Sequence, residues 1–152
     1  MPFSFPFDFH KEITVSQDPA SVFDFLKNYP QALPDFFPGL RRFEEENPKV
    51  YFWEFDAIKY RGSQLTISFK TRFEESSSLI VIHPYGSTSE TRLAGEWRVF
   101  PEPDGCRIKM HFHLDFSVPL PKLMKAMIAP LATLELSKLF EHYAKNLHDH
   151  FE

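Results

Sequence analysis

The chain has 152 residues, of which 43% are hydrophobic and 25% are charged. This composition is typical of a single globular domain, here residues 1–152, with a substantial core. No segment is apolar for long enough to span a bilayer, and the first residues lack the features of a signal peptide, so we expect a cytoplasmic protein without stable membrane insertion. A net charge of −4 argues against nucleic acid as a partner, because phosphate binding needs a clustered basic surface.

The first 40 residues predict one strand followed by two short helices. Apolar residues occupy almost every odd position of residues 3–15, which is the period of a strand. Pro6 on the other side favours an edge position, or a late start to regular pairing, because proline cannot donate to a sheet. Asp18 and Pro19 are typical of the cap and first residue of a helix. Further prolines leave room for one more short helix before Gly39.

Alternating apolar and polar residues predict only strands between positions 40 and 118. Each segment places aromatic or branched side chains on one face and charged or hydroxyl side chains on the other, and turn residues separate the segments. The expected strands include residues 49–60, 63–75, 78–84, 88–100 and 107–118.

His111 and His113 raise the question of a metal site. They share one face of the last expected strand with Lys109 and Asp115, whereas the opposite face is apolar from Ile108 onward. We therefore expect both histidines to face solvent. The sequence offers only these two candidate ligands, and zinc needs three or four, so we expect no metal site.

The remaining chain has a helical period. Apolar residues form two offset stripes, one before and one after Pro130. Because proline removes a helical hydrogen bond, we expect a kink or break there, with the longer helix covering about residues 130–150.

This order of elements resembles the START/Bet v 1-like (SRPBCC) superfamily, which has the helix-grip fold. Residues 13–44, "ITVSQDPASVFDFLKNYPQALPDFFPGLRRFE", are similar to the family's opening strand and its two short helices. Residues 112–147, "FHLDFSVPLPKLMKAMIAPLATLELSKLFEHYAKNL", are similar to its last strand and closing helix, most closely in the polyketide-cyclase and coenzyme-Q-binding branches. The resemblance implies an α+β fold in which a curved antiparallel sheet of about seven strands wraps a long C-terminal helix.

The resemblance also implies a cavity between the sheet and the helix for a hydrophobic small molecule such as a lipid, quinone, sterol or polyketide. Aromatic and methionine side chains are suited to such a pocket, although they are also ordinary core residues. We expect a binding or carrier protein without a cofactor. The residues expected to line the cavity are Phe37, Tyr51, Trp53, Phe55, Phe69, Thr71, His83, Trp97, Phe112, Met124, Met127 and Leu131.

Two alternatives stay open. An aromatase/cyclase-like enzyme would need at least two inward polar groups near one ligand, although the sequence has no nucleophile motif and no phosphate loop. A protein-interaction module would have a filled interior and an exposed apolar patch that meets a protein partner. The inward polar candidates, each of which also suits an ordinary structural role, are Tyr51, Lys59, Thr71, His83 and Thr91.

The segment "LPDFFPGL" is a candidate entrance to the cavity. Phe36 and Phe37 lie between two prolines, and the resemblance places Tyr85, Met124 and Met127 across from them. The alternative is that both phenylalanines fasten the short helix onto the sheet, since buried aromatic residues usually serve packing.

Overall fold

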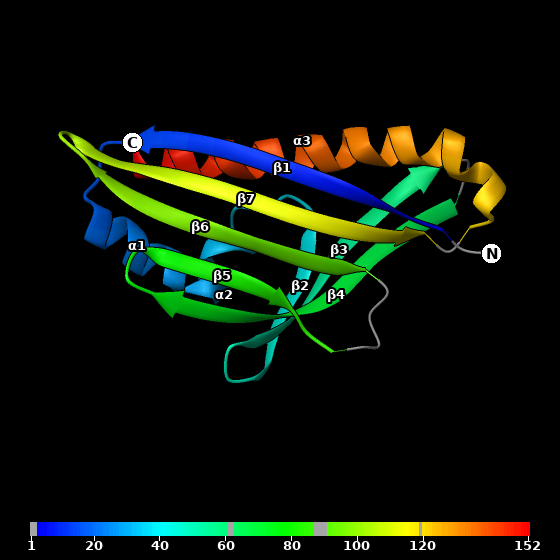
Figure 1. The fold of residues 1–152 in the computed structure, drawn as a ribbon, viewed down its shortest axis with the longest axis horizontal. Coiled ribbons are helices and arrows are strands. Elements are labelled where there is room, and N and C mark those ends of the chain that lie inside the picture. Colours follow the sequence, from blue (N-terminus) through cyan, green and yellow to red (C-terminus); the bar gives the residue numbers. More distant parts are fainter. Residues whose placement is uncertain (1–2, 61–62, 87–90, 119) are drawn as a thin grey trace.

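A computed structural model describes residues 3–60, 63–86, 91–118 and 120–152, and for residues 57–60 and 63–65 it describes only the backbone. Seven antiparallel strands form one curved sheet, and a long helix runs along it (Figure 1). The α+β helix-grip architecture predicted from the sequence is therefore confirmed. Residues 88–90, the start of one expected strand, lie outside the described residues.

The sheet has the order β1-β7-β6-β5-β4-β3-β2, so the first and last strands of the sequence are neighbours. All the pairs are antiparallel, and most of them join strands that are consecutive in the chain. The strands are β1 (Phe3–Val15), β2 (Leu40–Asn47), β3 (Val50–Tyr60), β4 (Ser63–Ser76), β5 (Leu79–Pro84), β6 (Arg92–Glu102) and β7 (Gly105–Val118).

β1 follows the predicted alternation. Phe3, Phe5, Phe7 and Phe9 are buried, and the residues between them are exposed. β1 lies at one edge of the sheet, as Pro6 predicts, and it pairs with β7 along its whole length. This pairing joins residues about 100 positions apart, and it sets the composition of the outer face described below.

Two short helices follow β1. α1 (Pro19–Lys27) begins as predicted: Asp18 is its N-cap, and its carboxylate accepts a hydrogen bond of 3.0 Å from the backbone nitrogen of Ser21. α2 (Tyr29–Ala32) is a single turn that begins after Asn28. The two helices lie at the end of the sheet where β1 ends (Figure 1).

α3 (Lys125–Phe151) is one continuous helix that follows the 3₁₀ turn η1 (Lys122–Met124). Of the expected kink or break at Pro130, a break is therefore excluded, and the helix begins at Lys125 rather than near residue 130. Pro130 removes the hydrogen bond to the carbonyl of Ala126, but both residues are exposed, so water can satisfy that carbonyl. No helix among the described residues is long and apolar enough to cross a membrane.

Candidate functional site

An apolar gap lies between the sheet and α3. Side chains from β3, β4, β6, β7 and α3 enclose a volume of about 10 Å³, which is room for about one water molecule. We call it the apolar gap. The residues that line it are Trp53, Phe55, Ile67, Phe69, Leu93, Leu114, Leu136, Leu139 and Phe140.

The polar groups near the gap hydrogen-bond to one another. The indole nitrogen Nε1 of Trp53 donates to Thr71 Oγ1 at 2.7 Å, and that of Trp97 donates to the Tyr143 hydroxyl at 2.9 Å. Burial raises the pKa of Tyr143, so this phenol is neutral at physiological pH. Every buried side-chain nitrogen or oxygen within the described part of the chain has a hydrogen-bond partner. These buried polar groups are thus engaged with one another, and the side chains that line the gap are apolar.

Three of the residues predicted to line the cavity, Trp53, Phe55 and Phe69, do line the gap. Thr71 adjoins it through Trp53. The others that are buried, in the core around the gap, are Phe37, Tyr51, Trp97 and Phe112.

Six of the gap residues were not predicted from the sequence. Ile67, Leu93 and Leu114 belong to the apolar strand faces that were predicted, but alternation does not show which residues along a face lie opposite the helix. The other three come from α3, after Pro130, and are Leu136, Leu139 and Phe140.

His83 and Thr91 lie away from the gap, and the side chain of Lys59 is outside the described residues. The buried residues of β5 are Ile80 and Ile82, so His83 faces outward and its Nε2 lies 2.8 Å from a carboxylate oxygen of Glu74. Thr91 is buried, and its hydroxyl accepts a hydrogen bond from the backbone of Ser117 at 3.2 Å. These polar groups do not converge on one point.

The first half of α3 presents apolar residues to solvent. Met127 and Leu131, both expected in the cavity, are each 48% exposed, whereas Ile128 and Ala132 face the sheet and are buried. Met124 is partly buried against the core. We call the exposed row the outer stripe: it consists of Leu123 in the preceding turn η1 and of Met127, Leu131 and Leu134 in α3.

The segment between α2 and β2 is a packing element. The ring of Phe37 is 3% exposed and stacks on Tyr143 with 3.9 Å between centroids. Phe36 makes an edge contact with Phe25, and its carbonyl accepts a hydrogen bond of 2.9 Å from Asn146. Of the two interpretations of this segment, the contacts favour packing: Phe37 fastens it to the sheet through Trp53 and Phe55, and the segment also contacts α1 and α3, which was not expected. Tyr85, the expected opposite side of the entrance, is 40% exposed.

A polar cluster lies where α2 meets β3 and β4. The Tyr29 hydroxyl donates to the Glu75 carboxylate, which also accepts a hydrogen bond of 2.7 Å from Lys49. Burial favours protonation of Glu75, but these two hydrogen bonds outweigh it and lower its pKa. Burial and the charge of Glu45 raise the pKa of Tyr51 to about 12. Because the phenol of Tyr51 stays protonated and Glu75 is occupied by two donors, we interpret the cluster as structural.

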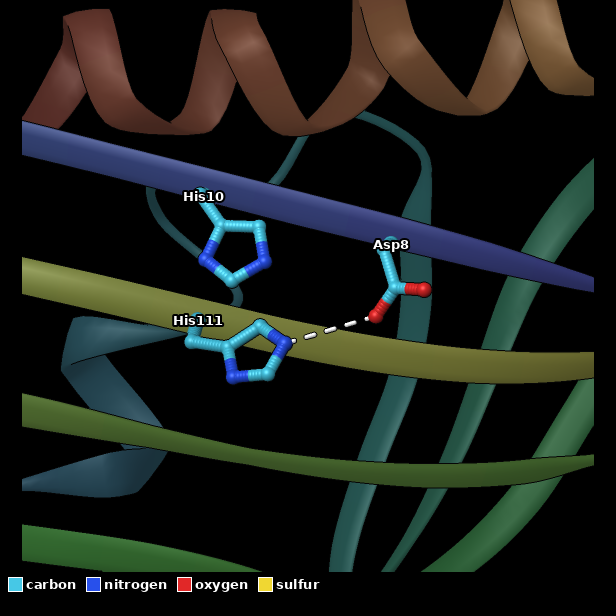
Figure 2. A group of neighbouring side chains, drawn as sticks. All are labelled: Asp8, His10 and His111. Atoms are coloured by element: carbon cyan, nitrogen blue, oxygen red, sulfur yellow. Dashed lines mark hydrogen bonds and ion pairs between the residues drawn. The ribbon is translucent and has the colours of Figure 1, made fainter.

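His111 and His113 face outward, as predicted, with about 40% of each side chain exposed. The sequence predicted only these two candidate metal ligands, however, and the structure adds others. The structure places β1 beside β7, with His10 opposite His111 and Asp8 opposite His113. Figure 2 shows Asp8, His10 and His111 side by side.

Comparison with known proteins gives one family and several structural relatives. A family model described as polyketide cyclase/dehydrase and lipid transport matches residues 15–140. No curated protein sequence matches this chain significantly.

Three solved structures show the same fold at low sequence identity. A START superfamily protein from Mycobacterium smegmatis has a TM-score of 0.63 and 16% identity, over 95% of this chain and 96% of that one. A STAR-related lipid transfer protein from Xanthomonas axonopodis has a TM-score of 0.62 and 14% identity, over 95% and 85% of the two chains. The Zhui aromatase/cyclase from Streptomyces sp. R1128 has a TM-score of 0.56 and 15% identity, over 93% and 94%.

Proposed function

The chain belongs to the polyketide cyclase/dehydrase and lipid transport family, and we propose from this membership that it binds a hydrophobic small molecule between the sheet and α3. The observation that carries the proposal is the apolar gap. Four strands and the helix line it with apolar side chains, and pockets for lipid-like ligands are built mainly from such side chains.

A ligand would have to enlarge the gap. Pockets for small molecules have volumes of roughly 300–1,000 Å³, far above the present 10 Å³ or so. The first half of α3 is the part best suited to move outward. It buries Ile128 and Ala132, it contains Pro130, and Met127 and Leu131 are each 48% exposed, so outward movement would break fewer contacts there than in a fully buried segment. The second half is anchored by Phe140 and Tyr143.

Binding is favoured over catalysis by the polar groups of the interior. An aromatase or cyclase needs positioned acids or bases beside its substrate. The hydroxyl of Thr71 beside the gap already accepts the Trp53 hydrogen bond, and that of Tyr143 accepts the Trp97 hydrogen bond. We therefore expect binding without turnover.

A protein-interaction role is the second candidate, and the outer stripe favours it. Leu123 is 95% exposed and Leu134 is 52% exposed, which is unusual for leucine on one helix face. A nearly filled interior together with an exposed apolar row fits this alternative as well. A direct binding experiment separates the two candidates.

The test is a titration of the protein with a fluorescent fatty acid, followed through energy transfer from Trp53, which lines the gap. Leu114→Ala should enlarge the gap and tighten binding severalfold. Ile108→Ala is the matched control, because Ile108 is equally buried on the same face of β7 but does not line the gap. Absence of binding by wild type and by Leu114→Ala would reject the proposal in favour of the interaction role. Equal effects of the two substitutions would show that the ligand binds elsewhere.

A further inference from the structure

The outer face of the β1–β7 pair carries a cluster of histidine and aspartate side chains that is separate from the apolar gap. Figure 2 shows Asp8 and His10 on β1, and His111 on the adjacent strand β7. The three side chains lie on the solvent side of the sheet, whereas α3 covers the opposite side. His113 lies next to them, and we call these four residues the β1–β7 cluster.

Strand register brings these residues together. His10 pairs directly with His111 across the two strands, and Asp8 pairs with His113. Residues two apart on a strand share a face, so each strand contributes two neighbouring side chains. Directly paired residues have Cβ atoms about 4.5–5.5 Å apart, which places all four side chains within reach of one another.

The potential ligand atoms already converge. One oxygen of Asp8 lies 3.3 Å from Nε2 of His111, and the ligand atoms of Asp8, His10 and His111 all lie within 4.8 Å of one another. Two atoms bound to zinc at about 2.0–2.1 Å and at a tetrahedral angle are about 3.4 Å apart. The Asp8–His111 distance already meets this requirement. Rotation of the exposed His10 side chain can bring its ring nitrogen closer to the ligand atoms of Asp8 and His111.

The stacked rings of His10 and His111 would have to turn to share an ion. Their centroids lie 3.9 Å apart and their planes are within 14°. A metal lies close to the plane of each imidazole that binds it, and two nearly parallel planes do not meet at one ion. Each ring already turns one nitrogen toward the side on which Asp8 lies (Figure 2), and His10 is exposed, so rotation of its side chain can direct that nitrogen to an ion held by Asp8 and His111.

Neighbouring side chains hold Asp8 in place. Its carboxylate lies 3.0 Å from Nδ1 of His113, and Nε2 of the same ring lies 3.2 Å from Asp115. Metal ligands are commonly oriented by such hydrogen-bonded partners. The row from Asp115 through His113 to Asp8 therefore fixes the carboxylate that faces His10 and His111.

We propose that Asp8, His10 and His111 form a binding site for a divalent first-row transition metal ion such as zinc, with His113 positioning Asp8. Two imidazoles and one carboxylate suit zinc and its neighbours in the series, whereas calcium and magnesium prefer oxygen ligands only. Three protein ligands leave a coordination position for water. The bound ion would join the edge strand β1 to β7 by side chains as well as by the backbone.

The test is calorimetric titration of the protein with zinc, together with thermal unfolding. We expect one zinc ion per chain with a Kd in the micromolar range. When the free zinc concentration is a hundred times Kd, binding to the folded state should raise the Tm by about 5–10 °C. His10→Ala and His111→Ala should each weaken binding by more than about 100-fold, and His113→Ala by about 10–100-fold.

Two substitutions serve as controls. His83→Ala removes another outward histidine of the sheet that also faces a carboxylate, that of Glu74. His148→Ala removes a histidine of α3 that lies near Asp149 and Glu152. Neither should alter zinc binding.

Nitrogen NMR of labelled histidine identifies the ligands directly, since zinc should shift the ring resonances of His10 and His111 and leave that of His83 in place. The proposal is overturned if wild type binds no zinc, or if His10→Ala and His111→Ala bind it as tightly as wild type does. Because the cluster and the gap lie on opposite faces of the sheet, failure here leaves the proposed ligand binding unaffected.

Discussion

Substitution of Phe37 by alanine tests whether the segment between α2 and β2 packs the fold together or opens it. The ring is buried, stacks on Tyr143 and meets Trp53, Phe55 and Phe140 edge-on at 5.2–6.3 Å between centroids. Removal of a buried phenylalanine side chain destabilises a protein by roughly 3–5 kcal/mol. Because four aromatic partners surround this ring, we expect a loss in the upper half of that range.

Urea denaturation measures this loss, and Phe36→Ala provides the comparison within the same segment. Phe36 is only partly buried, so its substitution should cost clearly less. The slope m should stay unchanged, because the surface exposed on unfolding is nearly the same. If Phe37→Ala stayed within about 0.5 kcal/mol of wild type, as surface substitutions do, the packing interpretation would be refuted.

Three further predictions concern the sheet, the core and the polar cluster around Glu75. Gly95→Ala should lower the free energy of unfolding by about 1–3 kcal/mol in urea, because the added Cβ would lie 2.5 Å from a ring carbon of Phe112. Trp97→Phe should cost about 1–3 kcal/mol beyond the change in volume, because it leaves the buried Tyr143 hydroxyl without its donor; Trp97→Phe combined with Tyr143→Phe should recover part of that loss. Burial opposes ionisation of Glu75, but its hydrogen bonds outweigh burial and lower its pKa, so its stabilising contribution is present at neutral pH and is lost as the pH falls through that lowered value. Below about pH 4.3, the free energy of unfolding of Glu75→Gln should therefore depend less steeply on pH than that of wild type.

Local patterns in the sequence determine most of this fold, and they do so through side-chain alternation. The buried odd positions of β1 and the capped start of α1 follow from period and from the chemistry of Asp18 and Pro19. Alternation also places His111 and His113 on the outer face. These features depend on residues only a few positions apart, so the sequence alone predicts them.

Features that depend on distant residues could not be predicted in the same way. Pairing of β1 with β7 joins the first and last strands of the sequence, and no turn between them signals it. The sequence therefore gave no reason to count Asp8 and His10 as neighbours of His111. Similarly, the register of β5 depends on its partners, and this register turns His83 outward.

The helix shows a further limit of sequence analysis. Apolar stripes before and after Pro130 suggested that both halves of α3 face the core, yet only part of the first stripe does, since Ile128 is buried and Met127 is 48% exposed. Leu136 reaches the apolar gap, whereas Met127 and Leu131 lie on the opposite side of the helix. The helix continues through Pro130 because this residue is exposed, and the local sequence does not reveal that exposure.

Native mass spectrometry of the protein purified gently from its own host tests the central claim most directly. Ligand binding between the sheet and α3 predicts one retained adduct of lipid-like mass on wild type. Leu139→Trp, which fills the apolar gap from the helix side, should abolish that adduct while the protein stays folded by circular dichroism. A wild-type protein that carries no adduct, or an adduct that Leu139→Trp retains in full, would contradict the account.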